Sequence, residues 1–76
     1  MKQRGIQDCI KDNLEKYFSD LNGESSNGVF KMVTQQAEAA TLKFVLDKVD
    51  QNQSEAARIL GINRATLKKK ASLYNL

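Results

Sequence analysis

The last twenty-five residues, NQSEAARILGINRATLKKKASLYNL, contain two predicted helix starts eleven residues apart, with a glycine between them. Asn52 is a predicted N-cap, and Glu55 stands three residues later as its capping-box partner. Gly61 can adopt a positive φ and end the first helix, and Asn63 can cap a second helix two residues further on. Because the chain must turn within two residues, this segment predicts a helix-turn-helix.

The side chains around this turn fit two closely crossing helices. Ala56 and Ala57 are small enough to let the helices approach each other, and Ile62 stands where a hydrophobic staple would pack. The predicted inward stripe of the second helix has the spacing i, i+4, i+7 and consists of Leu67, Ala71 and Tyr74.

Two longer helices are predicted before this motif. The chain has no proline and only four glycines, which favours long helices. Apolar residues recur at helical spacing over residues 6–21, and small, polar and glycine residues at 22–28 predict a loop. No helix breaker interrupts residues 28–49. One apolar stripe there consists of Val29, Val33, Ala37, Ala40 and Phe44, and a second surface consists of Leu42, Val45, Leu46 and Val49.

A chain of 76 residues makes one small domain with a marginal core. A helix of about 22 residues spans roughly 33 Å, as long as such a domain is wide. We therefore expect residues 1–51 to form a dimerisation core and residues 52–76 to form the helix-turn-helix region of the same compact domain. The alternative is a long helix that packs only within its own chain.

The composition excludes several classes of protein. The single cysteine, Cys9, cannot form an internal disulfide, suits a reducing cytoplasm, and is expected to be a small buried apolar side chain. No histidine is present, so no zinc cluster at ligand spacing is expected. No apolar run is long enough to span a membrane, and the N-terminus lacks a signal-peptide core. Without a paired-carboxylate pattern or a glycine-rich phosphate loop, we expect no catalytic residues, no metal, no cofactor and no enzyme.

The charge is unevenly distributed along the chain. Residues 1–51 carry seven Lys/Arg and eight Asp/Glu, whereas residues 52–76 carry five Lys/Arg and one Glu. A nearly neutral body with a basic end indicates a polyanion or an anionic surface as partner.

The outward face of the second helix has the residue types of a DNA-reading surface. At about 100° per residue from Leu67, the opposite side carries Ala65, Lys69 and Ser72. Asn63 and Arg64 stand at the helix N-terminus, the end that reaches base edges in this motif. Arginine can bind guanine through two hydrogen bonds, and asparagine can pair with adenine.

Other residues of the motif are predicted to contact phosphate groups. They are Thr66, Lys68 and Lys69 on the second helix, and Ser54 at the start of the first. Lys70 lies nearer the buried side, so a phosphate contact and a side chain that only extends along the surface remain alternatives.

Two sequence motifs resemble those of the factor for inversion stimulation (Fis) family. They are KYFSDLNG, at the end of the first predicted helix, and NQSEAARILGINRATLKKK, near the C-terminus. The second motif is also similar to the C-terminal DNA-binding domains of NtrC-type regulators, whereas the first favours the Fis family. The resemblance covers roughly residues 6–76.

The resemblance implies an all-α, four-helix subunit in an intertwined homodimer, with a C-terminal helix-turn-helix. It implies a protein of the bacterial nucleoid, in the cytoplasm, that binds double-stranded DNA with low specificity, bends it and regulates transcription. Asn63 and Arg64 fall on the family's base-reading pair. The positions that contact phosphate in the family, or are basic there, correspond to Asn52, Ser54, Thr66, Lys68, Lys69 and Lys70.

The chain departs from the family pattern at several positions. Enteric members carry an N-terminal arm that contacts DNA invertases, but only five residues precede the first predicted helix here. Ala40 replaces a proline that kinks the long helix, so we expect a straighter helix. Asp50 and Gln51 replace a basic, glycine-containing turn. The resemblance therefore does not support contact with a recombinase or RNA polymerase.

Two other interpretations of the sequence remain open. One is a dimerisation or protein-interaction module whose basic helix meets an acidic partner. The other is a detached NtrC-type DNA-binding domain.

Overall fold

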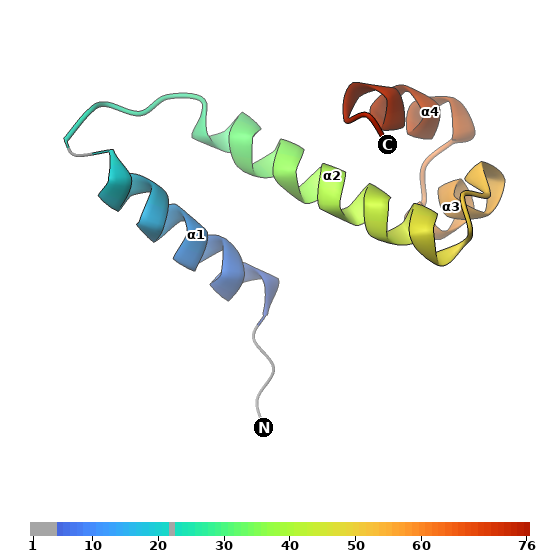
Figure 1. Ribbon diagram of the computed structural model, residues 1–76, viewed down its shortest axis with the longest axis horizontal. Helices are drawn as coiled ribbons and strands as arrows, with labels where there is room; N and C mark the ends of the chain where they lie inside the picture. The colour runs from blue at the N-terminus through green and yellow to red at the C-terminus, as the bar shows by residue number, and fades with distance from the viewer. Residues whose placement is uncertain (1–4, 22) are drawn as a thin grey trace. The chain divides into compact units, whose positions relative to one another are not determined.

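The computed structural model describes residues 5–21 and 23–76, and this part of the chain is all-α. The four helices are α1 (Ile6–Asp20), α2 (Val29–Lys48), α3 (Gln53–Leu60) and α4 (Arg64–Leu73) (Figure 1). The chain divides into two compact units, one that ends at Val33 and one formed by Thr34–Leu76. Among the described residues, no helix combines the length and the apolar character needed to cross a bilayer.

The first unit contains an amphipathic helix whose apolar face is not buried. None of the residues of α1, all of which are described, is buried. Ile6 is 72% exposed and Phe18 is 51% exposed. Cys9, predicted as a small buried side chain, is exposed, so that prediction is wrong for the single chain. The Tyr17 hydroxyl lies 3.0 Å from the Ser26 hydroxyl and ties the end of α1 to the following loop.

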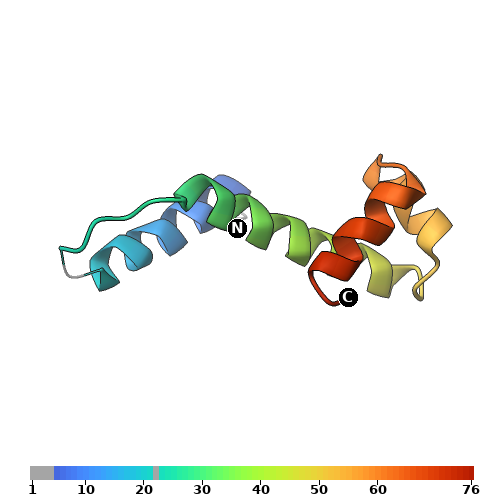
Figure 2. The same cartoon turned by 90° about the horizontal axis from the view of Figure 1, so that it is seen from above.

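The second unit has a small core to which three helices contribute. Figures 1 and 2 show α3 and α4 beside the C-terminal half of α2. Val45, Val49, Leu60, Ile62 and Tyr74 pack against the core as half-buried side chains. The buried residues come in pairs, two from each helix: Leu42 and Leu46, Ala56 and Ala57, Leu67 and Ala71. The predicted inward stripe of α4 is thus confirmed at Leu67 and Ala71, whereas Tyr74 is only half-buried.

The helix α2 is apolar on two opposite sides. Leu42 and Leu46, on the second of the two predicted surfaces, enter the core. Phe44 lies about 200° around the helix from Leu42 at about 100° per residue, and it is 68% exposed. Phe44 therefore faces away from the core that Leu42 and Leu46 enter. The helix also continues unbroken through Ala40, where proline would remove a backbone hydrogen bond.

The turn between α2 and α3 uses two non-glycine residues in the left-handed conformation. Asp50 has a φ of 52° and Gln51 has a φ of 66°. The Gln51 backbone N–H donates to the Leu46 carbonyl at 2.8 Å, which closes the end of α2. Its side-chain Nε2 donates to Asp47 Oδ1 at 3.1 Å. Glutamine lacks the conformational freedom of glycine, so this turn stores backbone strain.

We expect Gln51→Gly to raise the stability of the second unit. A left-handed conformation costs a non-glycine residue about 1–2 kcal/mol, and the greater freedom of glycine in the unfolded chain offsets roughly 0.5–1 kcal/mol of that gain. The net increase in the free energy of unfolding is about 1 kcal/mol or less, which thermal unfolding followed by circular dichroism can measure. Gln51→Ala is the control, because it removes the bond to Asp47 without relieving φ. A midpoint for Gln51→Gly that does not exceed that of Gln51→Ala would contradict the expected gain, because strain relief would then not outweigh the freedom of glycine in the unfolded chain.

Candidate nucleic-acid interface

The turn between α3 and α4 has the conformation predicted from Gly61. Gly61 has a φ of 75°, and its backbone N–H donates to the carbonyls of Ala57 and Arg58. The Ile62 N–H also donates to the Ala57 carbonyl, at 3.2 Å. These bonds form a Schellman motif, in which a left-handed residue lets the next N–H reach back to the last turn. The chain thereby turns within two residues and starts α4 at once.

Asn63 caps α4 as predicted. Its side-chain Oδ1 accepts a hydrogen bond from the Thr66 backbone N–H at 2.7 Å. The cap uses the side-chain oxygen, so the amide Nδ2 remains as a donor at the exposed tip of the helix. A single donated bond to a base acceptor is therefore more compatible with this geometry than the two-bond pairing with adenine.

The predicted capping box at the start of α3 is only half present. Asn52 Oδ1 accepts from the Glu55 backbone N–H at 3.1 Å, which confirms the N-cap. The Glu55 carboxylate does not return the bond, because Arg58 Nε donates to it at 3.2 Å and Arg58 also forms an ion pair with it. The Asn52 N–H donates instead to the Val49 carbonyl. The hydrogen bond from Arg58 lowers the pKa of the Glu55 carboxyl below its ordinary value.

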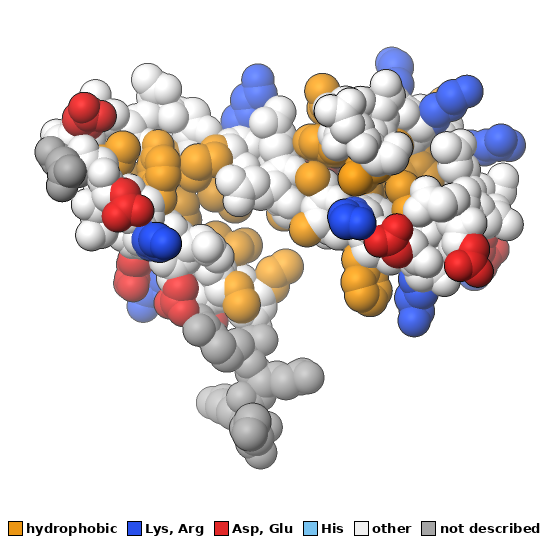
Figure 3. Space-filling model, viewed as in Figure 1, with side chains coloured by type: hydrophobic (Ala, Val, Ile, Leu, Met, Phe, Trp, Pro, Cys, Tyr) orange, Lys and Arg blue, Asp and Glu red, His pale blue; other side chains and the backbone are white. Residues whose placement is uncertain are grey.

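One face of α4 carries basic and small side chains that are open to solvent. Ala65, Lys69 and Ser72 are exposed, as the helical periodicity predicted, and Lys68 is exposed beside them. Within residues 5–21 and 23–76, no ion pair involves Arg64, Lys68 or Lys69. Figure 3 shows Lys and Arg side chains that project from the end of the chain containing α3 and α4. These charges can therefore act on a ligand.

The other predicted contacts lie at the N-terminal ends of α3 and α4. Ser54 is exposed in the first turn of α3, next to the cap residue Asn52, which is also exposed. Thr66 is half-buried at the start of α4. The predicted base-reading and phosphate-contacting residues thus lie at the N-terminal ends of α3 and α4 and along the outer side of α4, with one exception.

The exception is Lys70, whose ammonium forms an ion pair with Glu38 of α2. The Tyr74 hydroxyl donates to the other oxygen of the same carboxylate, Glu38 Oε2, at 2.8 Å. Hydrogen bonds from Lys70 and then from Tyr74 lower the pKa of the Glu38 carboxyl. The bond to Glu38 raises the pKa of the Lys70 ammonium, so both groups are charged at neutral pH. For Tyr74, burial and then the bond to Glu38 raise the pKa of the hydroxyl.

Glu38 is the residue of this region that the sequence motifs did not predict. It lies four residues before Leu42 and eight before Leu46, so it belongs to the same helical face as the buried residues of α2. An acidic side chain on a buried face requires a partner. That spacing is the signal in the sequence that could have identified Glu38.

The helix-turn-helix and most of the remaining chain are similar to known proteins. The profile described as bacterial regulatory proteins of the Fis family matches residues 35–71. A Fis-like DNA-binding protein of Neisseria meningitidis serogroup A is 46% identical over 71 residues, which are 93% of this chain and 90% of the relative. One from Ralstonia nicotianae is 43% identical over 76 residues, which are 100% of this chain and 99% of the relative.

A protein named DNA-binding protein Fis, from Proteus mirabilis, is also similar. It is 36% identical over 74 residues, which are 97% of this chain and 76% of that protein. Identity at this level extends over α1 and α2 as well as over the helix-turn-helix. A detached NtrC-type DNA-binding domain would not require similarity in α1 and α2. The chain belongs to the Fis family of bacterial helix-turn-helix DNA-binding proteins.

Proposed function

We propose that this protein is a dimeric nucleoid and transcription factor that inserts α4 into the major groove, binds with loose sequence preference and bends the DNA. The observation that carries the proposal is the geometry of α4. Its N-terminus is held at the surface by the Gly61 turn and the Asn63 cap, and its outer side carries basic residues that form no ion pair among the described residues. Such a helix fits the way this motif approaches base edges.

The proposed contacts divide into base-reading and phosphate-binding sets. Arg64, the first residue of α4, is exposed and presents its guanidinium to the edge of a guanine. Asn63 donates through Nδ2 to a neighbouring base acceptor. The phosphate-binding set consists of Asn52, Ser54, Thr66, Lys68 and Lys69. Lys70 does not belong to this set, because its ammonium is already paired with Glu38.

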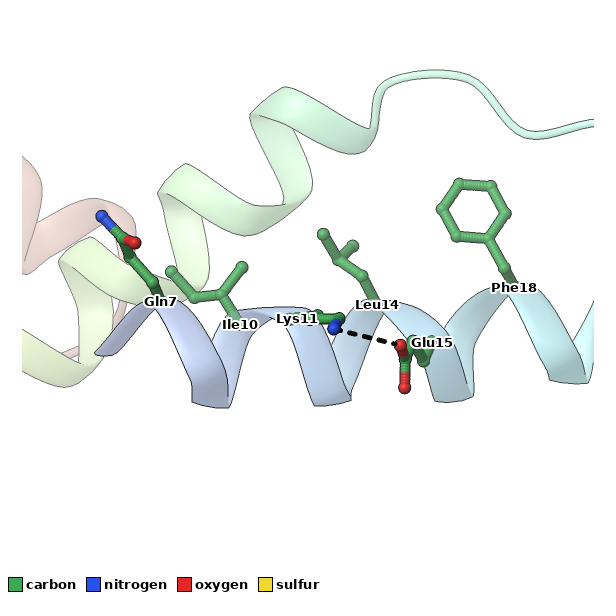
Figure 4. A pocket seen from close by; sticks show the side chains of 6 residues that line it. All are labelled: Gln7, Ile10, Lys11, Leu14, Glu15 and Phe18. Carbon is green, nitrogen blue, oxygen red and sulfur yellow. Dashed lines mark ion pairs between the residues drawn. The ribbon is translucent and has the colours of Figure 1, made fainter. Parts of the chain in front are cut away.

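The unburied apolar face of α1 supports the proposed homodimer. Ile10, Leu14 and Phe18 project from one side of α1, and the ion pair between Lys11 and Glu15 flanks them (Figure 4). Together with Gln7, these residues line an open hollow of about 610 Å³. Contiguous exposed apolar surface of this kind marks an interaction site. A second chain that covered it would also enlarge the core of this small protein.

Two exposed phenylalanines of α2 give independent support for the dimer. Phe30 is 83% exposed and Phe44 is 68% exposed, although leaving large apolar side chains in water forgoes about 1.5–3 kcal/mol each. We propose that both are covered by the partner subunit, so that α1 and α2 form the shared core and each subunit contributes one helix-turn-helix. Two recognition helices on one rigid dimer constrain the DNA path, which is the physical basis of the proposed bending.

A ring-closure assay on a short DNA fragment, titrated with protein at several salt concentrations, tests this function. We expect DNA affinity to fall by about 10³–10⁵ between 50 and 200 mM salt if a dimer makes about 6–10 phosphate contacts. We also expect closure of the fragment into circles to be enhanced when DNA is bound.

Each outcome of the assay addresses a different part of the proposal. Absence of DNA binding, or binding insensitive to salt, would contradict the DNA-binding function and favour a protein-interaction module. Binding without enhanced ring closure would contradict bending alone. Sedimentation of the protein at micromolar concentration tests the homodimer without DNA. A folded monomer at that concentration would contradict the shared core.

A further inference from the structure

The carboxylate of Glu38 joins α2 to α4 and its cap residue Tyr74. Its Oε1 pairs with Lys70, and its Oε2 accepts from the Tyr74 hydroxyl at 2.8 Å. Lys70 and Tyr74 are four residues apart, so they lie on one face of α4 and both reach the same group. All three residues belong to the second compact unit. The side chains of Lys70 and Glu38 are 35% and 37% exposed, clearly less than those of the surface pair Lys43 and Asp47, at 67% and 57%.

The three consecutive lysines of α4 consequently differ in direction and in partners. At about 100° per residue, Lys69 lies about 200° around the helix from the buried Leu67, whereas Lys70 lies only about 60° from it. Lys68 and Lys69 are exposed, and neither forms an ion pair in the described ranges. Lys70 points toward α2, away from the side that carries Ala65 and Ser72.

A charge that is already paired releases no counterions when DNA binds. The salt dependence of affinity counts the phosphates that protein cations neutralise. If Lys70 exchanged Glu38 for a phosphate, the Glu38 carboxylate would lose the cation that now pairs with it and keep only the bond from Tyr74. The geometry therefore opposes a contact between Lys70 and the DNA backbone, although the basic run KKK predicts one.

We propose that Glu38 is a positioning residue that withholds Lys70 from DNA, so that it sets the number of α4 charges acting on the phosphate backbone. This inference rests on the proposed DNA-binding function. Lys70 serves to hold α4 against α2, and Lys68 and Lys69 carry the electrostatic contact. Removing the negative charge at Glu38 releases Lys70 as an additional phosphate ligand.

The experiment is a salt titration of DNA affinity for the full-length protein and a set of single and double variants. The parent protein and Lys70→Gln are expected to have the same slope of log K against log [salt]. Lys69→Gln is expected to lower the magnitude of the slope by about 0.9 for each phosphate that is no longer neutralised, and by twice that in a dimer with two bound helices. Glu38→Gln keeps an oxygen for Tyr74 but removes the charge. It is therefore expected to increase the magnitude of the slope by the same amount, because Lys70 becomes free to neutralise a phosphate.

Glu38→Gln could increase the magnitude of the slope in two ways: by releasing Lys70, or by making the protein less negative as a whole. The double variant Glu38→Gln/Lys70→Gln distinguishes these two causes. If Lys70 carries the increase in slope, the double variant returns to the parental slope. The proposal would be overturned if the magnitude of the slope stayed above the parental value in the double variant. It would also be overturned if Lys70→Gln alone had a slope of smaller magnitude than the parent protein. Tyr74→Phe leaves the ion pair intact and is expected to keep the parental slope.

Failure of this inference is distinguishable from failure of the proposed function. A parent protein that does not bind DNA, or binds it without salt dependence, contradicts both. A parent protein with a steep slope, combined with equal decreases for Lys69→Gln and Lys70→Gln, contradicts only the role of Glu38. If Glu38→Gln does not fold, the comparison of Lys69→Gln with Lys70→Gln decides the question by itself.

Discussion

Leu67→Ala is expected to lower the free energy of unfolding by about 2–5 kcal/mol. Leu67 is 0% exposed and is the largest fully buried side chain among the described residues. It lies in the cluster with the buried residues of α2 and α3, so its removal leaves a cavity where three helices meet. Small domains have a total stability of about 5–15 kcal/mol, and a core of this size has few other side chains to offset the cavity.

The matched control for Leu67→Ala is Leu73→Ala on the same helix. Leu73 is 64% exposed, so its truncation removes little buried surface, and the expected change is within about 0.5 kcal/mol. Urea unfolding followed by circular dichroism measures both variants. DNA binding should be lost at a lower urea concentration in Leu67→Ala than in Leu73→Ala, because it depends on the fold. Similar unfolding midpoints for the two variants would contradict the assignment of Leu67 as the anchor of α4.

Arg64→Ala is expected to cost about 1–3 kcal/mol of DNA-binding free energy, roughly a 5–150-fold decrease in affinity, and to relax base preference. Arg64 is exposed at the first position of α4, so the substitution leaves the core and the Asn63 cap intact. The decrease has a physical reason: the guanidinium can donate two hydrogen bonds to one guanine, and alanine leaves those acceptors unpaired.

Lys69→Ala is the control for Arg64→Ala, because it also removes one positive charge from the exposed side of α4. Binding to a panel of DNA sequences at fixed salt distinguishes the two. Lys69→Ala should weaken all sequences by a similar factor, since a phosphate contact carries no base information. Arg64→Ala should weaken the preferred sequences most. A uniform decrease in Arg64→Ala would reassign Arg64 to the phosphate backbone.

The sequence predicted the helix-turn-helix almost residue by residue because its signals are local. The Asn52 cap, the left-handed Gly61 and the Asn63 cap each depend on atoms no more than five residues away along the chain. Local hydrogen bonds follow from residue type and spacing, and tertiary context did not override them here. The one local error was the capping box, where Arg58 competed successfully for the Glu55 carboxylate.

The sequence could not show which of two apolar surfaces of a helix is buried. The sequence contained two apolar surfaces on α2, and only the packing of α3 and α4 shows that Leu42 and Leu46 enter the core while Phe44 stays exposed. Periodicity identifies a face but not what covers it. For the same reason, the apolar stripe of α1 predicted a helix correctly, but Cys9 is exposed in the single chain.

The four helices, the sharp turn before α4 and the outward direction of Lys69 follow from the amino-acid order, because they depend on neighbouring residues and on the period of the helix. The tertiary structure alone decided that Lys70, 32 residues from Glu38, is paired with it. An ion pair across that separation exists only after α2 and α4 have packed, and no spacing along the chain encodes it. The helical period therefore distinguishes the directions of the three adjacent lysines, but only the folded protein shows the partner of Lys70.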